Sequence, residues 1–363
     1  MIKRELGSVC SRLSSGKSIR AENINPIGVY PVIGGNGLRG YTDSYNFDGE
    51  CAVIGRQGAA CGNVRYHSGK AYMTEHAVVV CANDENDTRY LSYLLSIQNL
   101  GRLSAQSAQP GISVKTLSKQ EVFLPPLDEQ KRVSQLLGTI DSKINANTKL
   151  NDYLAELCEL IVSRSEATDG ALSDICTQVT DKVSCTEAQI DSYVSTESLL
   201  ADKNGRQLAA SVPRTGKVVV YKAGDTLVSN IRPYFKKIWF AENDGTCSGD
   251  VVVFRANNPS LAPYLYAILR SDKFFDYVMS GAKGTKMPRG DKKQMMSYGI
   301  NPYCPERDLE IIAFAVYGIG ASNQENQYLS SLRDSLLPKL MSGEIDTSKV
   351  ELPTLPNNHL CDH

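Results

Sequence analysis

Residues 128–164 read DEQKRVSQLLGTIDSKINANTKLNDYLAELCELIVSR, and one set of side chains recurs in them at alternating spacings of four and three. This set comprises Ile140, Ile144, Asn147, Asn151, Leu154, Cys158 and Ile161. The alternation is that of a coiled-coil seam, here with polar residues at its middle. Because buried asparagine costs stability but fixes register, the stretch predicts a long helix with one specified partner.

A second stretch of this kind is PERDLEIIAFAVYGIGASNQENQYLSSLRDSLLPKLM, residues 305–341. Here the places of Ile140, Asn147 and Ile161 are taken, 179 residues later, by Ile319, Asn326 and Leu340. Two such helices can bury their seams on one another, although two independent amphipathic helices, each packed on its own domain, would share the pattern. Gly318 and Gly320 predict a bent or weakly formed early part, since each glycine costs about 1 kcal/mol relative to alanine.

The regions outside these helices repeat one another. TEHAVVVCANDENDTRYLSYLL (74–95) aligns with SGDVVVFRANNPSLAPYLYAIL (248–269), in each case a β-branched strand, a polar connection and a short helix. DGECAVIGRQGA (48–59) aligns with AGDTLVSNIRPY (223–234), each a glycine-containing turn and a strand. Such a repeat predicts two similar β-rich domains, each running into one long helix.

Two further matches extend the repeat and set the domain boundaries. Each upstream strand leads to an arginine, Arg56 or Arg232, and Lys119-Gln120 matches Lys293-Gln294. Prolines precede both helices and mark the junctions between domain and helix. The predicted segments are a β-rich domain over 1–126, a helix over 127–169, a second β-rich domain over 170–303, a second helix over 304–345 and a tail over 346–363.

The glycine pattern Gly35-x-Gly37-x-x-Gly40 resembles a dinucleotide-binding fingerprint. That fingerprint requires a helix to open at its last glycine, and the residues that follow lack a helical apolar period. Asn36-Gly37 and Asp48-Gly49 instead predict tight turns between short strands. Of three functional classes, a DNA-binding protein, an assembly protein and an enzyme that uses this loop, the enzyme is therefore the least supported.

Composition narrows the function further. The ten cysteines are scattered without a Cys-x-x-Cys pair, and the four histidines lack zinc-site spacing, so reduced thiols and no metal site are expected. The absence of a signal peptide or long apolar run predicts a cytoplasmic protein with no membrane contact. Motifs of catalytic triads, phosphate-binding loops and methyltransferases are missing, which predicts a chain without its own catalysis or cofactor.

Charge is segregated along the chain although the formal net charge is only −1. Residues 203–240 have a balance of +7, and residues 283–293 add five basic side chains against Asp291. Residues 121–166 are rich in acidic side chains. The basic stretches suit contacts with phosphates, while an ordinary solvated surface remains an equal alternative.

Several of these stretches resemble one protein family, the specificity subunits of type I restriction-modification enzymes. LPPLDEQKRVSQLLGTIDSKINANTKLNDYLAELCELI (124–161) resembles their central conserved helical region, and LRDSLLPKLMSGEI (332–345) resembles its distal counterpart. YPVIGGNGLRGYTD (30–43), STESLLADKNG (195–205) and GDTLVSNIRPYFKKIWFA (224–241) are similar to motifs of their target-recognition domains.

The resemblance implies an α+β fold in which two target-recognition domains are separated by two long conserved helices forming an antiparallel coiled coil, with a pseudo-two-fold internal repeat. It implies a non-catalytic subunit that reads a bipartite double-stranded DNA sequence for two methyltransferase subunits and, where present, ATP-dependent restriction subunits. S-adenosylmethionine would then bind the methyltransferase partners. The alternative is a non-catalytic assembly protein that uses the helices without reading DNA.

Residues predicted to face DNA combine basic, amide and aromatic groups, which suit phosphate contact and base-edge contact together. In the first domain they are Arg39, Tyr41, Arg56, Gln57, Arg65 and Lys115. In the second domain they are Asn230, Arg232, Tyr234, Lys236, Lys237, Lys286 and Arg289. The helix seam is predicted to contain Ile140, Ile144, Asn147, Leu154, Ile161, Ile319, Asn326 and Leu340.

Overall fold

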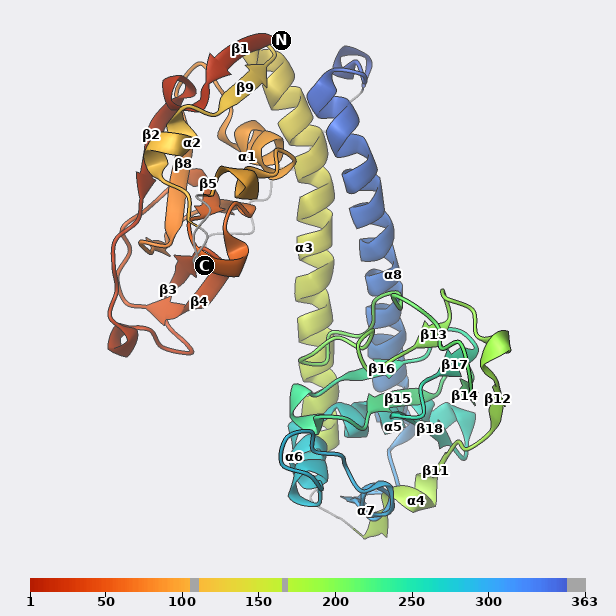
Figure 1. Ribbon diagram of the computed structural model, residues 1–363. Coiled ribbons are helices and arrows are strands. Elements are labelled where there is room, and N and C mark those ends of the chain that lie inside the picture. The colour runs from red at the N-terminus through yellow and green to blue at the C-terminus, as the bar shows by residue number, and fades with distance from the viewer. Residues whose placement is uncertain (105–110, 165–168, 351–363) are drawn as a thin grey trace. The chain divides into compact units, whose positions relative to one another are not determined.

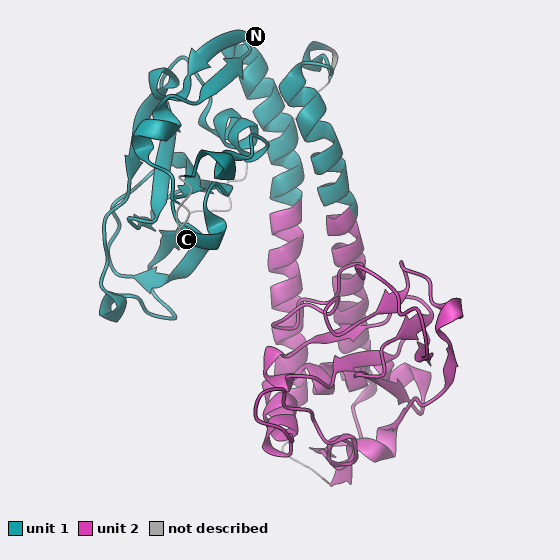
Figure 2. Ribbon diagram, viewed as in Figure 1, with its two compact units in different colours: residues 1–143, 328–363 teal, residues 144–327 magenta. Residues whose placement is uncertain are grey.

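The computed structural model describes residues 1–104, 111–164 and 169–350. The chain forms two compact units (Figure 2): unit 1 consists of residues 1–143 and 328–363, and unit 2 of residues 144–327. Two long helices, α3 (Leu127–Ser163) and α8 (Glu306–Ser342), each contribute one part to either unit. The predicted α+β class with two long helices is confirmed.

Unit 1 contains a four-stranded antiparallel sheet in the order β2-β8-β5-β6 and a three-stranded sheet in the order β4-β3-β7. A separate pair, β1-β9, connects the first residues to the strand before α3. The strands are β1 (Ile2–Glu5), β2 (Cys10–Ser15), β3 (Tyr30–Gly34), β4 (Gly37–Thr42), β5 (Glu50–Gly55), β6 (Val64–Ser68), β7 (Tyr72–Met73), β8 (Ala77–Ala82) and β9 (Glu121–Leu124). The helices besides α3 and α8 are α1 (Thr88–Ser96) and α2 (Val114–Ser118).

The core of unit 1 lies between its four-stranded sheet and the helices. Strands β5 and β8 are rich in β-branched and other apolar residues, and α1 packs against β5 (Figure 1). Asp87 caps α1 by accepting a hydrogen bond from the Tyr90 amide at 2.7 Å. Leu137 of α3 and Leu340 of α8 are buried in the same cluster, so both long helices belong to this core.

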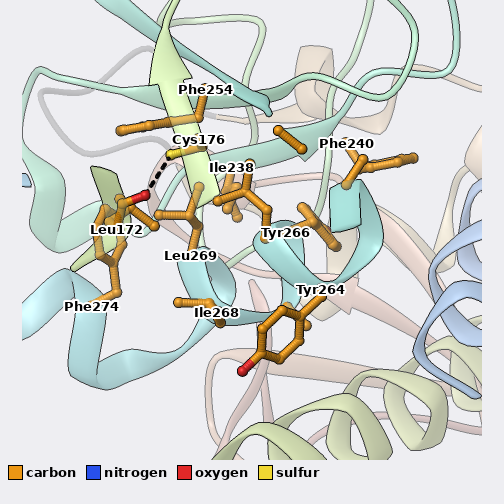
Figure 3. Close-up of a cluster of buried hydrophobic side chains, with 14 of the residues drawn as sticks. Leu172, Cys176, Ile238, Phe240, Phe254, Tyr264, Tyr266, Ile268, Leu269 and Phe274 are labelled. Carbon is orange, nitrogen blue, oxygen red and sulfur yellow. Dashed lines mark hydrogen bonds between the residues drawn. The ribbon is translucent and has the colours of Figure 1, made fainter. Parts of the chain in front are cut away.

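Unit 2 contains two four-stranded sheets, in the orders β11-β18-β15-β16 and β12-β14-β17-β13, and the pair β10-β19. The strands are β10 (Gly170–Ala171), β11 (Cys176–Gln178), β12 (Lys182–Ser184), β13 (Tyr193–Val194), β14 (Lys217–Tyr221), β15 (Thr226–Ser229), β16 (Ile238–Phe240), β17 (Gly245–Cys247), β18 (Val251–Ala256) and β19 (Gly299–Ile300). The helices besides α3 and α8 are α4 (Leu172–Ile175), α5 (Ala262–Arg270), α6 (Asp272–Ser280) and α7 (Lys292–Met296). Apolar side chains from the sheet β11-β18-β15-β16 and from α4, α5 and α6 meet in the largest hydrophobic core of unit 2 (Figure 3).

Register within the sheets shows how the two units correspond. Gly55 of β5 pairs with Ala77 of β8, and Ser229 of β15 pairs with Val251 of β18, at the same place of the same strand order. The residue equivalent to Arg56 is therefore Asn230 and not Arg232, and the sequence alignment, which places Ile231 opposite Arg56, is shifted by one position. Counted from the paired strand ends, Gly58 corresponds to Arg232, and both have left-handed backbones, with φ of 71° and 50°, although the 3-10 helix begins at Gly58 in unit 1 and one residue after Arg232 in unit 2.

The proposed match of Lys119-Gln120 with Lys293-Gln294 is also wrong. Lys293 lies inside α7, whereas Lys119 follows the end of the equivalent helix α2. The connection from β18 to α7 is four residues longer than that from β8 to α2. A single constant difference in residue number therefore does not relate equivalent residues of the two units beyond this connection.

Helices α3 and α8 pair in an antiparallel direction. In unit 2, Asn147 Nδ2 donates to Asn326 Oδ1 at 3.0 Å, and Asn151 Nδ2 donates to Asn323 Oδ1 at 2.9 Å. In unit 1, Arg333 Nη1 donates to Asp141 Oδ1 at 3.0 Å. Residues later on α3 thus meet residues earlier on α8.

The predicted seam residues differ in what they contact. Asn147 and Asn326 meet directly, and Leu154 contacts the α8 backbone at Gly318, where an added Cβ would lie 3.4 Å from Leu154 Cδ1. Ile140 is buried, and Ile144 and Ile319 are half-buried on the same helices. Ile161 and Leu340 pack into the cores of unit 2 and unit 1 respectively.

The expectation that Gly318 and Gly320 weaken α8 is wrong, because the helix is unbroken from Glu306 to Ser342. Both glycines lie where other side chains approach the helix closely. A Cβ on Gly320 would lie 3.0 Å from Glu242 Oε1. Packing within unit 2 thus outweighs the low helix propensity of glycine.

Candidate nucleic-acid interface

One candidate surface in unit 2 forms where strand β15 ends. Residues 230–237 leave the strand through a short 3-10 helix, Pro233–Phe235, and contact residues 283–290. The Arg232 amide donates to Pro288 O at 2.8 Å, and the Gly290 amide donates to Asn230 O at 3.3 Å. We call these two segments together loop surface 2.

Loop surface 2 contains all seven residues of the second domain predicted to face DNA, namely Asn230, Arg232, Tyr234, Lys236, Lys237, Lys286 and Arg289. Asn230 is only 7% exposed, yet its Oδ1 has no hydrogen-bond partner among the described residues, and the same is true of Arg232 Nε. Buried polar atoms without partners are unusual and are satisfied when a ligand supplies the missing group. Tyr234, Lys286 and Arg289 are exposed beside them, Arg289 in an ion pair with Asp250 at 3.2 Å.

Lys236 and Lys237, also predicted to face DNA, make contacts inside unit 2. Lys236 Nζ lies 2.9 Å from Asp272 Oδ1, and the hydrogen bond to this carboxylate raises the pKa of the lysine. Lys237 Nζ donates to Thr196 O at 2.7 Å, and burial lowers its pKa. The +7 stretch therefore contributes less free positive charge than its composition indicates.

Other basic residues of that stretch are occupied in the same way. Lys203 Nζ lies 3.0 Å from Glu159 Oε1 and 2.8 Å from Asp272 Oδ1. The Arg206 guanidinium lies over the Trp239 ring, 4.5 Å from its centroid. Arg214, Lys217 and Lys222 remain exposed on unit 2.

In unit 1 the glycine-rich turn between β3 and β4 is surrounded by arginines. A Cβ on Gly34 would lie 2.8 Å from Arg39 Cδ, and one on Gly37 would lie 3.1 Å from Arg65 Nη1. One on Gly35 would lie 3.5 Å from the Arg56 amide nitrogen. The turn is a hairpin, as predicted, and its lack of side chains lets the three arginine residues approach it; we call this group loop surface 1.

The remaining predicted residues of unit 1 lie around this group or at a distance along the sheet. Exposed Gln57 forms an isolated bridge with Gly111, and the next amide, that of Ile112, donates to Arg56 O at 2.9 Å. Lys115 is exposed on α2, which begins two residues after Ile112. Tyr41 lies at the opposite end of β4 from the turn, where its backbone pairs with Asn25.

Sequence reasoning named Tyr234 but missed its neighbour Phe235 and a second group of aromatic residues in unit 1. The ring of Phe235 contacts that of Tyr234 on loop surface 2, with centroids 4.6 Å apart and planes inclined by 51°. In unit 1, the ring centroids of Tyr45 and Tyr30 are 5.0 Å apart. The Nζ atom of Lys70 lies over the Tyr45 ring, 4.9 Å from its centroid. Those three residues come from separate loops and strands, so their sequence spacing contains no signal.

The described residues contain no cluster of three or more metal-binding side chains. Nine of the cysteines are described, and each is a free thiol. Burial raises the pKa of several, that of Cys176 to about 12, which makes these thiols poor nucleophiles at neutral pH. Among the described helices, none has the length and apolar character needed to cross a membrane.

Comparisons with known proteins find similarity over part of the chain and in its fold. Residues 1–156 match the Type I restriction modification DNA specificity domain. This part of the chain is similar to the DNA specificity domain of type I restriction-modification systems. The chain is 36% identical over 177 residues to the EcoprrI type I restriction enzyme specificity subunit of Escherichia coli, covering 45% of this chain and 44% of that protein.

More distant similarities cover other lengths of the chain, or the fold alone. A putative type I specificity subunit of Mycoplasma pneumoniae is 25% identical over 153 residues, covering 40% of this chain and 49% of that protein. The matches thus span about half the length of these two relatives. The crystal structure of a type I restriction-modification S subunit from M. genitalium covers 93% of this chain and 95% of its own with a TM-score of 0.60 and 19% identity, which shows a common fold.

Proposed function

We propose that this chain is a type I specificity subunit that reads a bipartite DNA sequence, with each unit contacting one half. The observation that carries this proposal is the equivalence of loop surfaces 1 and 2. Each includes residues that follow the end of an inner strand of the four-stranded sheet, at Gly55 or Ser229, and each contains arginine residues. Equivalent positions with different side chains, such as Arg56 and Asn230, suit the reading of two different base sequences.

The partners we propose are two methyltransferase subunits, which would bind S-adenosylmethionine and supply the chemistry, and restriction subunits where the system has them. Support comes from a stripe of exposed apolar side chains on α3 in unit 2. It contains Leu150, Tyr153, Leu157 and Leu160, which are 48%, 68%, 38% and 53% exposed. These positions lie at spacings of three and four, on one face of the helix, as a partner helix requires.

A counterpart lies on α8 in unit 1, again 179 residues later. Leu329 and Leu332 occupy the places of Leu150 and Tyr153 and are half-buried, whereas Leu336, at the place of Leu157, packs against the core of unit 1. Equivalent apolar positions in each unit suit two copies of one partner better than a single partner. The chain itself would act in the cytoplasm without catalysis.

Reconstitution tests this function directly. The purified chain should methylate no DNA alone, and should direct methylation to one bipartite sequence after addition of the methyltransferase subunits and S-adenosylmethionine. A methylation map of the product would give both half-sites. Turnover by the isolated chain would contradict the proposal.

A salt titration separates DNA reading from the alternative of an assembly protein. If several phosphates are contacted, the logarithm of affinity should fall linearly with the logarithm of salt, with a slope of about −0.9 for each phosphate. Assembly with the methyltransferase subunits but no salt-dependent DNA binding would favour the assembly role. Leu157→Asp should prevent assembly through the α3 stripe, whereas Lys149→Ala on the same helix serves as the exposed control.

A further inference from the structure

Unusual backbone conformations converge beside loop surface 2. Among the described non-glycine residues five have positive φ, and four of them lie in two short turns: Asp202, Lys203, Arg232 and Lys236, with φ of 56°, 62°, 50° and 49°. Side chains disfavour this left-handed region, and a residue remains there only when its surroundings hold it. Such a concentration of strain points to a functional element and not to a simple connection.

The two strained turns are bound to each other. The Asp202 amide donates to Phe235 O at 2.9 Å, and the Lys203 amide donates to Lys236 O at 3.0 Å. Both lysine Nζ atoms then approach the same oxygen, Asp272 Oδ1, at 2.8 Å and 2.9 Å. Asp272 is the first residue of α6, so the pair of turns is anchored to a helix of the core.

These contacts hold two aromatic rings in the solvent. Tyr234 and Phe235 lie between Arg232 and Lys236, with ring centroids 4.6 Å apart and ring planes inclined by 51°, and remain 46% and 38% exposed. Exposed aromatic side chains on a rigid turn leave a large apolar area uncovered, which a ligand with a flat face would bury. The flanking groups are basic: Arg232 has an Nε without a partner among the described residues, and residues 283–290 add Lys286 and Arg289.

Unit 1 lacks this device at the equivalent place. There the 3-10 helix after β5 is Gly58–Ala60, which contains no aromatic residue, and glycine takes the left-handed position of Arg232 without strain. The aromatic pair is therefore not needed to build the fold. It distinguishes unit 2 from unit 1.

We propose that Tyr234 and Phe235 form an aromatic wedge that stacks on an opened base step of duplex DNA, in one half-site only. The inference rests on the proposed DNA reading of unit 2. Every base offers a π-face to an aromatic ring, and side chains that insert between base pairs unstack and bend the duplex. The basic neighbours suit the phosphates on either side of such a step, which favours DNA over an apolar protein surface as the occupant.

The test uses the full chain assembled with the methyltransferase subunits, without S-adenosylmethionine, and target duplexes with 2-aminopurine at one position at a time. The methylated adenine itself is never replaced. We expect a rise in fluorescence at one step of one half-site, because 2-aminopurine brightens when it loses its stacking neighbour. The double variant Tyr234→Ala with Phe235→Ala should abolish that rise and weaken binding about tenfold.

Two matched variants separate stacking from other roles. Tyr234→Phe keeps the ring and removes the hydroxyl, so both the fluorescence rise and the affinity should be retained. Tyr303→Ala removes another exposed aromatic side chain of unit 2, 69% exposed and outside the loop, and should change neither. Co-purification with the methyltransferase subunits shows that each variant is folded and assembled.

The outcomes distinguish failure of the aromatic wedge from failure of the proposed DNA reading. Sequence-specific binding of wild-type complex without a local rise in fluorescence, or a rise that persists in the double alanine variant, would overturn the wedge alone. Loss of co-purification in that variant, with the rise retained in any complex that forms, would show that the rings dock on the methyltransferase and would overturn it too. Absence of specific binding by wild-type complex would overturn the proposed DNA reading as well.

Discussion

Asn147 and Asn326 occupy equivalent positions of two different helices and form a hydrogen bond with each other, 3.0 Å between Nδ2 and Oδ1. Asn147 is only 4% exposed, and its Nδ2 also donates to Glu325 Oε2 at 2.7 Å. Only one alignment of α3 with α8 satisfies these donors and acceptors. The pair therefore specifies the register of the helices within unit 2.

Asn147→Leu should destabilise unit 2 by about 1–3 kcal/mol, because Asn326 and Glu325 lose a buried donor. The double variant with Asn326→Leu should recover part of that loss while weakening the specification of register. Urea unfolding of the two single variants and the double variant measures the coupling, with exposed Lys149→Ala as the control. Additive effects would mean that the asparagines act independently.

Asp225→Asn should destabilise unit 2 by about 3 kcal/mol, since it leaves a partly buried guanidinium without its counter-ion. Asp225 is 2% exposed and accepts hydrogen bonds from Arg255 Nε at 2.8 Å and Nη2 at 2.6 Å. Thermal unfolding compared with Asp276→Asn, an exposed carboxylate of the same unit, provides the measurement. Equal midpoints for the two variants would contradict the expected role.

The hydrogen bonds from Lys203 and Lys236 lower the pKa of Asp272 to about 2, from an ordinary value of 3.8. A carboxyl group whose folded pKa is depressed stabilises the fold above its unfolded pKa, and this contribution is lost as pH falls through the folded pKa. Wild-type protein should therefore lose its stability advantage over Asp272→Asn between about pH 4 and pH 2. Because the side chain is 59% exposed, the advantage should be small; a difference that is constant with pH would exclude this titration as its source.

Arg232→Gly should weaken binding, or relax one half-site, by about 1–3 kcal/mol. Glycine adopts φ of 50° without strain, so this variant removes the guanidinium and keeps the backbone, as Gly58 does in unit 1. Stability should stay the same or rise, which separates DNA contact from folding. Unchanged affinity together with an unchanged methylation sequence would remove Arg232 from the interface.

An insertion of four helix-forming residues after Lys143 should lengthen α3 by about 6 Å, or one to two base pairs. If the helices set the spacing, both half-site sequences should persist while the unspecified spacer between them grows. A matching insertion after Gln327 should restore activity lost in the single insertion, because Asp141–Arg333 and Asn147–Asn326 then remain paired on either side. Methylome sequencing would contradict the idea if the half-sites changed and the spacer did not.

Local patterns in the sequence were sufficient to predict the two long helices, their asparagines and the repeated β-rich units. Such features depend on the periodicity of side chains that are close in sequence, and this periodicity can be read from the sequence alone. The glycine-rich turn of unit 1 was predictable for the same reason, since the residues after Gly40 lack the period of a helix.

Only the tertiary structure decided the register of the repeat and the state of the charges. Strand pairing shows that Asn230, and not Arg232, is the residue of unit 2 equivalent to Arg56. Packing keeps helix α8 unbroken through Gly318 and Gly320. Asp272 is distant in sequence from Lys203 and Lys236, yet it binds both and removes them from the free basic surface. Composition counts charges, whereas which of them are neutralised depends on side chains that meet only when the chain is folded.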